Sequence, residues 1–490
     1  MFNIKVPNYA QYGKNLALED KEGVFSMTFL GNKKNIHFIG IGGISMSGLA
    51  EIMLENGYRV SGSDIHTSDL IDKLIKNGAT ISIPHDGKNV EDAELVVYTA
   101  AVKQDNPEII RAKELSIPIM DRASFLGSIM KNYSYGIAIS GCHGKTTTTS
   151  MASIIFKNAR LDPTILIGGE LDAIDGNVRV GKSQYFITEA CEYVESFLKF
   201  HPFIGAILNI EKDHLDYYRD IDHIISAFSK FAALIPKDGC LVACSDNKHA
   251  MDIARDVECN VITYGIKNSA DYEAYNIVYN DLGHPAFNVR YKGEELGLFK
   301  LNIPGIHNVS NALASIAIAS YAGIPLEITR SSLTEFRGTY RRFDIKGTQN
   351  CITVVDDYAH HPTEIKATLE AAKQFPHKKI WCIFQPHTYT RTKNLFEDFS
   401  QAFYGADKVI VTDIYAAREK DNGEVRPSDL VDEINKYSSN AIYSNDFDNI
   451  AYMIAKEANP GDLVFTMGAG DIFKLGPMIL DKLKPECVGY

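Results

Sequence analysis

The sequence predicts an α/β protein built of three domains. Its 490 residues suit about three domains at roughly 100–200 residues each. Short apolar runs that read as strands alternate with helical segments in three successive series, and this alternation favours parallel sheets with helices on their faces. The first two series each open on a strand that leads through a glycine turn into a helix, which is the start of a βαβ unit.

The composition is that of an ordinary folded protein. Hydrophobic residues make up 45% of the chain and charged residues 23%, with 36 Gly and 17 Pro, values that exclude collagen-like and largely disordered proteins. The 50 basic and 62 acidic side chains give a net charge of −12, which opposes binding to nucleic acid or to an anionic membrane. We therefore expect no nucleic acid among the partners, although a local basic pocket could still bind a small anion.

The sequence also predicts a cytoplasmic protein with no membrane insertion. Residues 1–23 lack the apolar core of a secretory signal, and nowhere do about 18 apolar residues follow one another. The eight Cys are scattered, without a C-x-x-C pair or a His/Cys cluster of zinc-binding spacing. Reduced thiols are the expected state.

The first domain is expected over residues 1–130. A buried strand at 36–43 runs into a glycine turn, and residues 47–56 have helical spacing that ends before Gly57. The alternation continues with strands at 58–64, 79–83, 94–102 and 116–122 and a helix at 70–78.

The second and third domains are expected over residues 131–338 and 339–490. The second begins with a strand at 135–140 and continues with strands at 185–190, 203–210, 239–244 and 260–265, a β-rich stretch over 272–303 and a helix at 307–323. A break near Gly338 precedes a third series, with strands at 351–359, 379–386, 408–416 and 462–470. A last domain of about 150 residues has an ordinary size.

The first glycine turn has the layout of a nucleotide-binding fingerprint. Gly40, Gly42 and Gly43 follow the strand, Ser45 occupies the third glycine position, and Asp64 ends the next strand. Glycines let the backbone approach a pyrophosphate, the helix N-terminus supplies amide donors, and a carboxylate can bond a ribose hydroxyl. The pattern leaves open whether the ligand is NAD or a nucleotide-sugar, and a tight structural turn is the alternative.

The second glycine turn is a shortened phosphate loop. Gly141–Thr146 (GCHGKT) lies between an apolar strand and a helix, and Ile139 stands where the strict pattern has its first glycine. In such a loop Lys145 reaches the terminal phosphates of ATP, and Thr146 offers its hydroxyl to Mg²⁺. The structural alternative is a glycine turn with an exposed lysine. It explains less well than a phosphate loop why strand, glycines, lysine, hydroxyl and helix occur together.

Polar residues follow several of the predicted strands, at the sheet edge where ligands of open α/β sheets gather. Glu189 lies near the end of the strand at 185–190, and Glu192 follows that strand. Near the end of the strand at 203–210 and just beyond it lie the polar residues Asn209, Asp213, His214 and Asp216. Oxygen ligands of this kind suit Mg²⁺. Three denser groups lie at 307–311, 341–343 and 356–362; a helix cap, surface charge and a packed turn are their structural alternatives.

Taken in order, these motifs resemble the Mur ligase family. The resemblance is carried by HFIGIGGISMSGLAE, GCHGKTTTTSM, TEACE, LNIEKDHLDYY, GIHNVSNALA, RGTYRRFD, DDYAHHPTEI, FQPHTYTRT and DIYAAREK, which together extend over essentially the whole chain after the first residues. It implies a Rossmann-like N-terminal domain that holds the UDP end of a substrate. It further implies a central P-loop ATPase-type domain with a parallel sheet, and a Rossmann-like C-terminal domain that completes the ATP and amino-acid sites.

The resemblance also implies the reaction. The expected enzyme uses ATP and Mg²⁺ to join L-alanine to the carboxylate of UDP-N-acetylmuramic acid through an acyl phosphate, as a monomer or homodimer, in peptidoglycan precursor synthesis. The alternative within the family is a recycling enzyme that attaches a tripeptide to the same UDP-sugar. FQPHTYTRT favours the alanine-adding enzyme.

Carried over residue by residue, the resemblance assigns substrate-binding, ATP-binding, metal-binding and catalytic roles. The UDP-sugar would be bound by Gly40, Gly42, Gly43, Ser45 and Asp64, and the amino acid by Tyr358, His360 and Arg391. ATP would be bound by Gly141, Cys142, His143, Gly144, Lys145, Thr146, Thr147, Asn308, Asn311, Arg342 and Asp357. Mg²⁺ would be held by Thr146, Glu189 and His214, and the catalytic residues would be Lys145, His214, Arg342 and His360.

Two positions depart from the family pattern. Cys191 replaces the Asp of an E-A-D-E motif, which leaves both glutamates in place. Thr388 stands where many relatives have Arg, so that Arg391 is the expected ligand of the amino-acid carboxylate. No residue type identifies the general base, and His360 is a candidate because imidazole titrates near neutrality.

Overall fold

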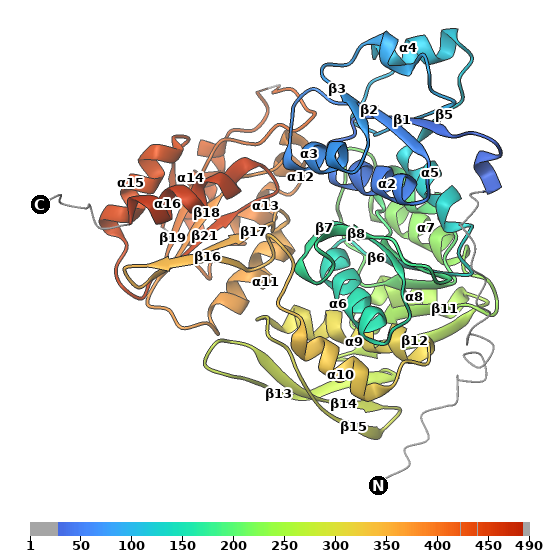
Figure 1. The fold of residues 1–490 in the computed structure, drawn as a ribbon. Coiled ribbons are helices and arrows are strands. Elements are labelled where there is room, and N and C mark those ends of the chain that lie inside the picture. Colours follow the sequence, from blue (N-terminus) through green and yellow to red (C-terminus); the bar gives the residue numbers. More distant parts are fainter. Residues whose placement is uncertain (1–27, 422, 439, 484–490) are drawn as a thin grey trace, which may run out of the picture. The chain divides into compact units, whose positions relative to one another are not determined.

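Three sheets and their helices make up the protein, as a computed structural model describes it for residues 28–421, 423–438 and 440–483 (Figure 1). The prediction of an α/β protein with three domains is confirmed. The boundaries near residues 130 and 338 remain predictions. None of the described helices has the length and apolar character needed to cross a membrane.

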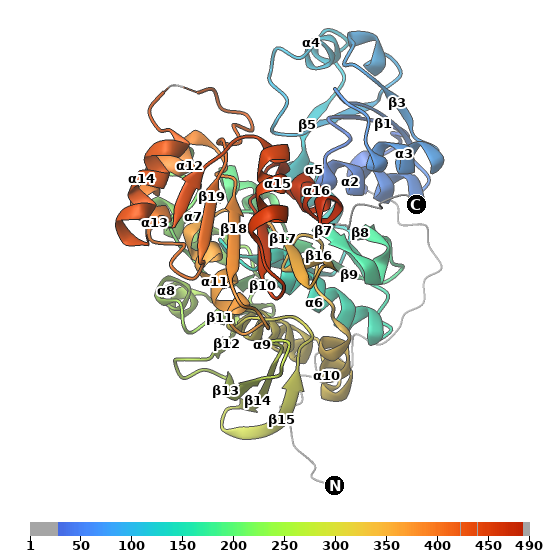
Figure 2. The same cartoon turned by 90° about the vertical axis from the view of Figure 1, so that its left-hand side faces the viewer.

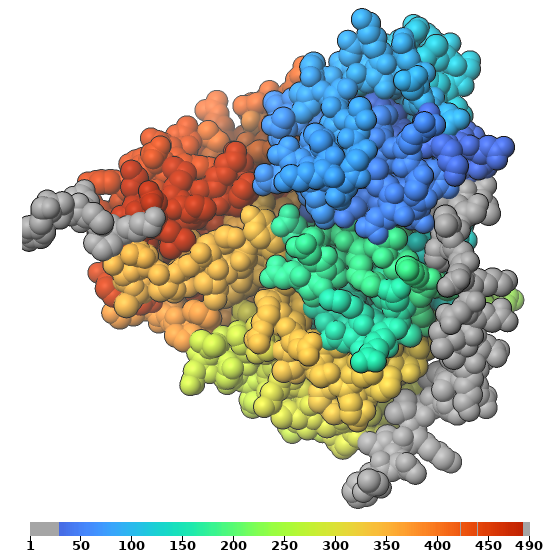
Figure 3. All heavy atoms as spheres, in the orientation of Figure 1, coloured from blue at the N-terminus to red at the C-terminus, as the bar shows by residue number. Residues whose placement is uncertain are grey.

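The first sheet is parallel, with strand order β3-β2-β1-β4-β5. Its atoms and those of its helices, in blue, form one continuous body in the space-filling view (Figure 3). The strands are β1 (Asn35–Ile39), β2 (Arg59–Ser63), β3 (Thr80–Ser82), β4 (Leu95–Tyr98) and β5 (Ile119–Asp121). The helical segments are η1 (Thr28–Leu30), α2 (Ile44–Glu55), α3 (Asp69–Lys76), η2 (Gly87–Val90), α4 (Pro107–Glu114) and α5 (Arg122–Met130).

Side-chain caps explain where several of these helices begin. Ser68 accepts a hydrogen bond from the amide of Ile71 at the start of α3, and Asn106 accepts one from Glu108 at the start of α4, where Pro107 occupies the first helical position. Asp121 caps α5 in the same way. Such caps satisfy amides that have no partner within the helix.

The second sheet has ten strands in the order β15-β14-β13-β12-β11-β10-β6-β9-β7-β8. Its centre is parallel, whereas the β7–β8 and β14–β15 pairs are antiparallel. The strands are β6 (Tyr135–Ser140), β7 (Thr164–Leu171), β8 (Gly176–Arg179), β9 (Tyr185–Glu189), β10 (Ile204–Ile207), β11 (Cys240–Cys244), β12 (Asn260–Gly265), β13 (Tyr272–Tyr279), β14 (Pro285–Tyr291) and β15 (Glu294–Lys300). The helical segments are α6 (Lys145–Asn158), η3 (Asp172–Ile174), η4 (Tyr193–Lys199), α7 (Ile221–Ala232), α8 (Lys248–Asp256), α9 (Ile306–Tyr321) and α10 (Leu326–Glu335).

The third sheet has the order β16-β17-β21-β18-β19-β20, and only its β16 edge is antiparallel. The strands are β16 (Asp344–Gln349), β17 (Ile352–Asp357), β18 (Ile380–Phe384), β19 (Lys408–Val411), β20 (Ala441–Tyr443) and β21 (Leu463–Met467). The helical segments are α11 (Pro362–Ala372), α12 (Tyr389–Asn394), α13 (Phe396–Ser400), α14 (Pro427–Tyr437), α15 (Phe447–Glu457), η5 (Asp471–Lys474) and α16 (Leu475–Lys482).

Helices cover both faces of this third sheet (Figure 2). Val355 and Cys382 face a core formed with α11, α13 and α14, while their neighbours Val354 and Trp381 face a second core formed with α15 and α16. Successive residues of a strand point to opposite faces, so a strand covered on both sides is apolar throughout. This is why these strands appear in the sequence as continuous hydrophobic runs.

Contacts within the chain divide it into two compact units. Unit 1 comprises Met1–Glu211, Asp222–Glu273 and Ala312–Leu333, and unit 2 comprises Lys212–Ile221, Ala274–Asn311 and Thr334–Tyr490.

Candidate active site

The glycine turn after β1 is closed by the carboxylate at the end of β2. The amide of Gly42 donates to Oδ2 of Asp64 at 2.8 Å, and the amide of Ile65 donates to Oδ1 at 2.7 Å. Gly40 has a φ of +79°, and a Cβ there would lie 2.6 Å from a methyl carbon of Thr99. Glycine is therefore required at position 40, and Asp64 shapes the turn.

The predicted phosphate loop lies between β6 and α6 in unit 1. Gly141 and Gly144 have φ angles of +142° and +84°, which favour glycine. Gly144 is the N-cap residue of α6, and no side chain caps this helix start. The loop therefore leads into a helix N-terminus suited to an anion.

Asn209, two residues beyond β10, is distant from this loop in the sequence but forms hydrogen bonds with it. Its Oδ1 accepts from the amide of His143 at 2.8 Å, and its Nδ2 donates to the carbonyl of His143 at 3.0 Å. The amide of Cys142 donates to the carbonyl of Asn209 at 3.2 Å. These three hydrogen bonds fix the middle of the loop.

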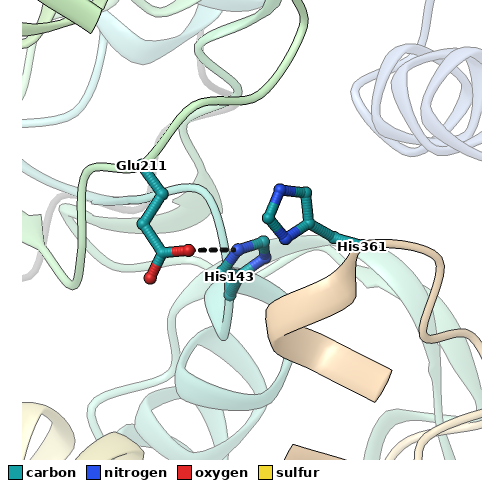
Figure 4. Close-up of side chains that lie close together, drawn as sticks. All are labelled: His143, Glu211 and His361. Atoms are coloured by element: carbon teal, nitrogen blue, oxygen red, sulfur yellow. Dashed lines mark ion pairs between the residues drawn. The ribbon is translucent and has the colours of Figure 1, made fainter. Parts of the chain in front are cut away.

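Glu211 makes further contacts with the same loop. Its amide donates to Sγ of Cys142 at 3.2 Å, and its carboxylate lies 3.5 Å from Nε2 of His143 (Figure 4). Cys142 is buried, so its thiol serves the internal packing of the loop.

Lys145, the first residue of α6, is folded against its own loop. Its Nζ donates to the carbonyls of Gly141 and Cys142, at 2.5 and 3.1 Å. The carboxylate of Glu192 lies 2.9 Å from the same nitrogen. Burial by itself lowers the pKa of this ammonium, but Glu192 more than offsets it and the net effect raises the pKa. Lys145 is therefore a charged group held in place by a buried carboxylate.

Glu189, the predicted metal ligand, ends β9 in unit 1. Its Oε1 accepts from the amide of Gly168 in β7 at 2.7 Å. A Cβ at Gly168 would lie 3.0 Å from both carboxylate oxygens. The side chain is partly exposed, and its second oxygen is not engaged by this hydrogen bond.

In unit 2, Arg391 forms a buried ion pair with Asp213. Nη2 and Nε of the guanidinium lie 3.0 and 3.2 Å from Oδ1 of the carboxylate. Burial by itself raises the pKa of Asp213, but Arg391 outweighs it and the pKa lies well below its usual value. The neighbouring His214, the other predicted metal ligand, has Nε2 3.8 Å from Oδ2 of Asp213.

His387 and Tyr415 complete the surroundings of Arg391. Nη1 of Arg391 lies 3.1 Å from Nδ1 of His387, and the ring of His387 stacks on that of Tyr415, with centroids 5.7 Å apart. A guanidinium can only donate, so Nδ1 of His387 is the acceptor. Burial lowers the pKa of His387 to about 4, and its single ring proton therefore lies on Nε2.

Arg341 and Arg342 have different surroundings in unit 2. Arg341 donates to Asp356 at 2.8 Å and to the carbonyls of Gly468 and Gly470 at 2.6 and 3.3 Å, so its role is structural. Arg342 pairs with Glu364 at 3.5 Å. Both guanidinium groups lie about 5 Å from the ring of Tyr358, at 5.0 and 5.1 Å, as in cation–π contacts.

Asp357 receives backbone hydrogen bonds from the segment that enters the third sheet. Its Oδ2 accepts from the amide of Phe343 and its Oδ1 from that of Ala359, both at 2.8 Å. Burial raises its pKa to about 6. This predicted ribose ligand therefore holds the backbone at Phe343 and Ala359.

The two adjacent histidines after β17 have different hydrogen-bond partners. His361 is the N-cap residue of α11, where its Nδ1 accepts from the amide of Thr363 at 3.3 Å. Nδ1 of His360 instead lies 3.0 Å from the carbonyl of Tyr358 and 3.2 Å from the carboxylate of Glu364. The sequence pattern alone did not separate the capping histidine from its neighbour.

Asn308 and Asn311 lie on the first turns of α9 and are buried. Nδ2 of Asn308 donates to the carbonyl of Pro304 at 2.7 Å, and Nδ2 of Asn311 donates to Oδ1 of Asn308 at 3.1 Å. The preceding His307 is buried enough that its pKa falls to about 4. The two amides thus form a connected pair within unit 2.

Three protein-family models match consecutive segments of the chain. The Mur ligase family, catalytic domain, matches residues 35–134; the Mur ligase middle domain matches 139–319; the Mur ligase, glutamate ligase domain, matches 341–470. A curated relative, the UDP-N-acetylmuramate–L-alanine ligase of Caldanaerobacter subterraneus subsp. tengcongensis, is 56% identical over 451 residues, which cover 92% of this chain and 98% of the relative. The chain belongs to the Mur ligase family.

Solved Mur ligase structures share this fold. The UDP-N-acetylmuramate-alanine ligase of Thermotoga maritima superposes with a TM-score of 0.79 at 31% identity, over 91% of this chain and 98% of that one. The murein peptide ligase of Psychrobacter arcticus gives a TM-score of 0.70 at 26% identity, over 93% and 100% of the two chains.

The structure adds residues of this Mur ligase whose roles the motifs did not reveal. Glu192 and Asn209 were noted only as polar residues after strands, and the structure shows them bound to Lys145 and His143. Glu364 was not singled out, although its place four residues after His360 puts it near that residue at the start of a helix. For Asn209 no local signal exists, because its partner lies 66 residues away.

Proposed function

We propose that the protein is an ATP-dependent ligase that joins L-alanine to the carboxylate of UDP-N-acetylmuramic acid. The observation that carries the proposal is the phosphate loop of unit 1, with Lys145 fixed at the start of α6, in a chain 56% identical to a relative named for this reaction. The identity extends over 98% of that relative, so the supporting likeness is not confined to the ATP-binding part.

The chemistry needs two displacements. A carboxylate is a poor electrophile because its leaving group would be oxide. One carboxylate oxygen of the muramoyl group therefore attacks the γ-phosphorus of ATP, ADP leaves, and an acyl phosphate forms. The amine of L-alanine then attacks the acyl carbon, inorganic phosphate leaves, and one proton is released from the nitrogen. Negative charge develops in both steps, and fixed cations stabilise it.

The UDP end is assigned to the first domain. Gly40, Gly42 and Gly43 allow close approach of the pyrophosphate to the backbone at the start of α2, with Ser45 in its first turn. Asp64 closes the turn, and its carboxylate would also accept a hydrogen bond from a ribose hydroxyl, because each carboxylate oxygen can accept more than one. A bound uridine nucleotide is the ligand expected here rather than NAD.

ATP phosphates are assigned to the loop Gly141–Gly144 and the start of α6, Lys145–Thr147. Lys145 already carries its charge at the loop, so phosphate oxygens would take the place of carbonyl and carboxylate oxygens as its partners. Arg342 would bind the γ-phosphate, Asp357 the ribose, and Asn308 with Asn311 the adenine. These assignments rest on the family motifs.

The residues present fit Mg²⁺. The hydroxyl of Thr146 and the carboxylate of Glu189 are hard oxygen donors of the kind the ion prefers, and one oxygen of Glu189 is free of the bond to Gly168. His214 would hold a second ion. When bound, Mg²⁺ neutralises phosphate charge and orients the transferring phosphoryl group.

The amino acid is assigned to unit 2. Arg391 would bind its carboxylate, because a guanidinium and a carboxylate match in geometry and charge. His360 and Tyr358 would face its amine side. The enzyme would act in the cytoplasm, as a monomer or homodimer, with no nucleic acid and no membrane among its partners.

Phosphate release from ATP and Mg²⁺ tests this function. The purified protein is incubated with UDP-N-acetylmuramic acid and either no amino acid, L-alanine, D-glutamate, or the tripeptide L-Ala-D-Glu-diamino acid. We expect turnover with L-alanine alone. Turnover only with the tripeptide would move the assignment to the recycling ligase, and hydrolysis indifferent to the UDP-sugar would refute the proposed reaction.

A further inference from the structure

Glu364 connects two residues of the proposed site. It occupies the first turn of α11, where its Oε1 lies 3.5 Å from Nη1 of Arg342 and its Oε2 accepts from the amide of His360 at 3.1 Å. The same Oε2 lies 3.2 Å from Nδ1 of the His360 ring. The carboxylate is only 10% exposed, so solvent does little to weaken these contacts.

The surroundings of His360 define which ring nitrogen carries its proton. Nδ1 faces the carbonyl of Tyr358 and the carboxylate of Glu364, and both are acceptors. Burial lowers the pKa of His360 to about 3, so the ring is neutral and holds one proton. That proton lies on Nδ1, and Nε2 presents a lone pair.

Nε2 of His360 is not used by the protein itself. Among the residues that the structure describes, it makes no hydrogen bond, and the ring is 18% exposed. The charged and titratable groups that act on this ring are Glu364, Arg391, His387 and Asp213. A ring nitrogen with a lone pair therefore lies within the electrostatic influence of Arg391, the guanidinium proposed for the amino-acid carboxylate.

His387 is held in the opposite tautomer. Arg391 donates to its Nδ1, so its Nε2 carries the proton, and its ring centroid lies 5.8 Å from that of His360. One histidine thus offers a donor and the other an acceptor. A carboxylate is attracted by the donor and by Arg391, whereas an N–H of an amine is attracted by the acceptor.

We propose that Glu364 is a positioning residue that fixes the Nδ1–H tautomer of His360, so that Nε2 accepts a hydrogen bond from the amine of the incoming amino acid. Glu364 acts through His360 and touches no substrate. The inference rests on the proposed function for the identity of the amine, but the tautomer is a property of the free protein. With the ring reversed, Nε2–H would face the amine and the lone pair of the nucleophile would be drawn towards a donor.

The tautomer is measured by NMR in the full-length protein with ¹³C,¹⁵N-labelled histidine. Loss of one signal among the 14 histidines in the His360→Gln variant identifies His360. We expect its ring nitrogen and Cδ2 shifts to report a neutral Nδ1–H ring. In Glu364→Gln the new amide can donate to Nδ1, and we expect the signal to move towards the Nε2–H form. An Nε2–H ring in the unmodified protein, or an unchanged ring in Glu364→Gln, overturns the proposal.

Kinetics distinguish positioning from general damage. We expect Glu364→Gln to lower kcat/KM for L-alanine by about tenfold, the effect of one lost hydrogen bond, with the KM for UDP-N-acetylmuramic acid unchanged. Exchange of ¹⁸O within ATP in the presence of the UDP-sugar alone measures acyl-phosphate formation. It should stay within about threefold, because the amide oxygen that replaces Oε1 in Glu364→Gln can still accept from Nη1 of Arg342. An equal loss in both measurements overturns the proposal.

Glu370→Gln is the matched control on the same helix. Glu370 is exposed and pairs with Lys373 and Tyr404, far from the site residues along α11, and its replacement should alter neither the His360 signal nor the kinetics. Failure of the unmodified protein to use L-alanine would refute the proposed function, whereas the tautomer measurement needs no turnover and would still test the role of Glu364.

Discussion

Lys145 and Glu192 form a buried ion pair, with Nζ 2.9 Å from a carboxylate oxygen and the two side chains 15% and 2% exposed. Glu192→Gln would leave the ammonium without its counterion. We expect the free protein to lose about 3 kcal/mol of unfolding free energy, because an uncompensated buried charge is strongly destabilising. Urea denaturation at pH 7 measures this loss.

The double variant Lys145→Met/Glu192→Gln provides the control for this pair. Removing both charges should restore part of the stability lost in Glu192→Gln, since no unpaired charge remains. A double variant less stable than either single variant would contradict a direct pairing.

Lys145→Ala tests the proposed contact with the phosphates of ATP. We expect ligation to fall at least about 100-fold, the typical effect of removing one preorganised donor from developing charge. Binding of UDP-N-acetylmuramic acid, measured by calorimetry, should be unchanged because it is assigned to the first domain. Lys157→Ala, at the other end of α6, is the control, and undiminished ligation in Lys145→Ala would refute the assigned role.

Arg391→Lys tests recognition of the amino-acid carboxylate. Lysine keeps the charge but loses the planar fork that binds carboxylates, so we expect the KM for L-alanine to rise about tenfold or more, with the KM for ATP unchanged. Steady-state kinetics at varied L-alanine decide this. Lys393→Arg, an exposed change on the same helix, is the control and should leave both constants unaltered. Unaltered constants in Arg391→Lys would show that Arg391 only pairs with Asp213 and does not bind the amino acid.

Glu108 is expected to make stability depend on acid pH. This buried carboxylate accepts from Ser63 and Asn89 at 2.5 and 2.6 Å and lies 3.7 Å from His37. Burial alone raises its pKa, but the nearby His37 and the hydrogen bonds from Ser63 and Asn89 lower it from 4.5 to about 2. The unfolded carboxylate takes up a proton at higher pH than the folded one, so its stabilisation is fully present above about pH 4.5 and is lost as the pH falls towards 2.

Glu108→Gln measures that contribution. We expect it to destabilise the protein by about 2 kcal/mol at pH 7 and to flatten the decline of stability between pH 5 and about 3, as followed by thermal denaturation. Glu114→Gln, an exposed position at the end of the same helix, should leave the profile unchanged. If the stability of Glu108→Gln declined with falling pH in parallel with that of the unmodified protein, Glu108 would be excluded as the source of the decline.

The parts of the fold that the sequence predicted are those with a strong local pattern. The strands β1, β6, β10, β17, β18 and β21 are apolar runs, and the two glycine turns lie where the motifs placed them. The strands β7, β8, β16 and β20 were not predicted, and of these β8, β16 and β20 lie at sheet edges. An edge strand needs no continuous apolar run, because one side of it has no partner strand to bury it.

The site residues divide in the same way. Lys145 and Arg391 could be named because their motifs are local, but the carboxylates that hold them, Glu192 and Asp213, come from other parts of the chain. A sequence pattern contains the residue types of a site; which charges face each other depends on the folded chain. The pairing of Arg341 with Asp356 and of Arg342 with Glu364 shows this for two adjacent residues that look equivalent in the sequence.

Strand β7 carries contacts to both the first domain and the proposed metal site. A Cβ at Gly48 of α2 would lie 2.4 Å from the side chain of Leu166, and two residues further along the strand the amide of Gly168 holds Glu189. The adjacent β8 supplies Asn177, whose Nδ2 donates to the carbonyl of Ile44 at the start of α2 at 2.7 Å. The length of two residues in β7 thus sets the spacing between the helix proposed for the UDP-sugar and the carboxylate proposed for the metal ion. Because successive residues of a strand face opposite sides of the sheet, one residue inserted between Leu166 and Gly168 would turn either the side chain that packs on α2 or the amide that holds Glu189 away from its partner.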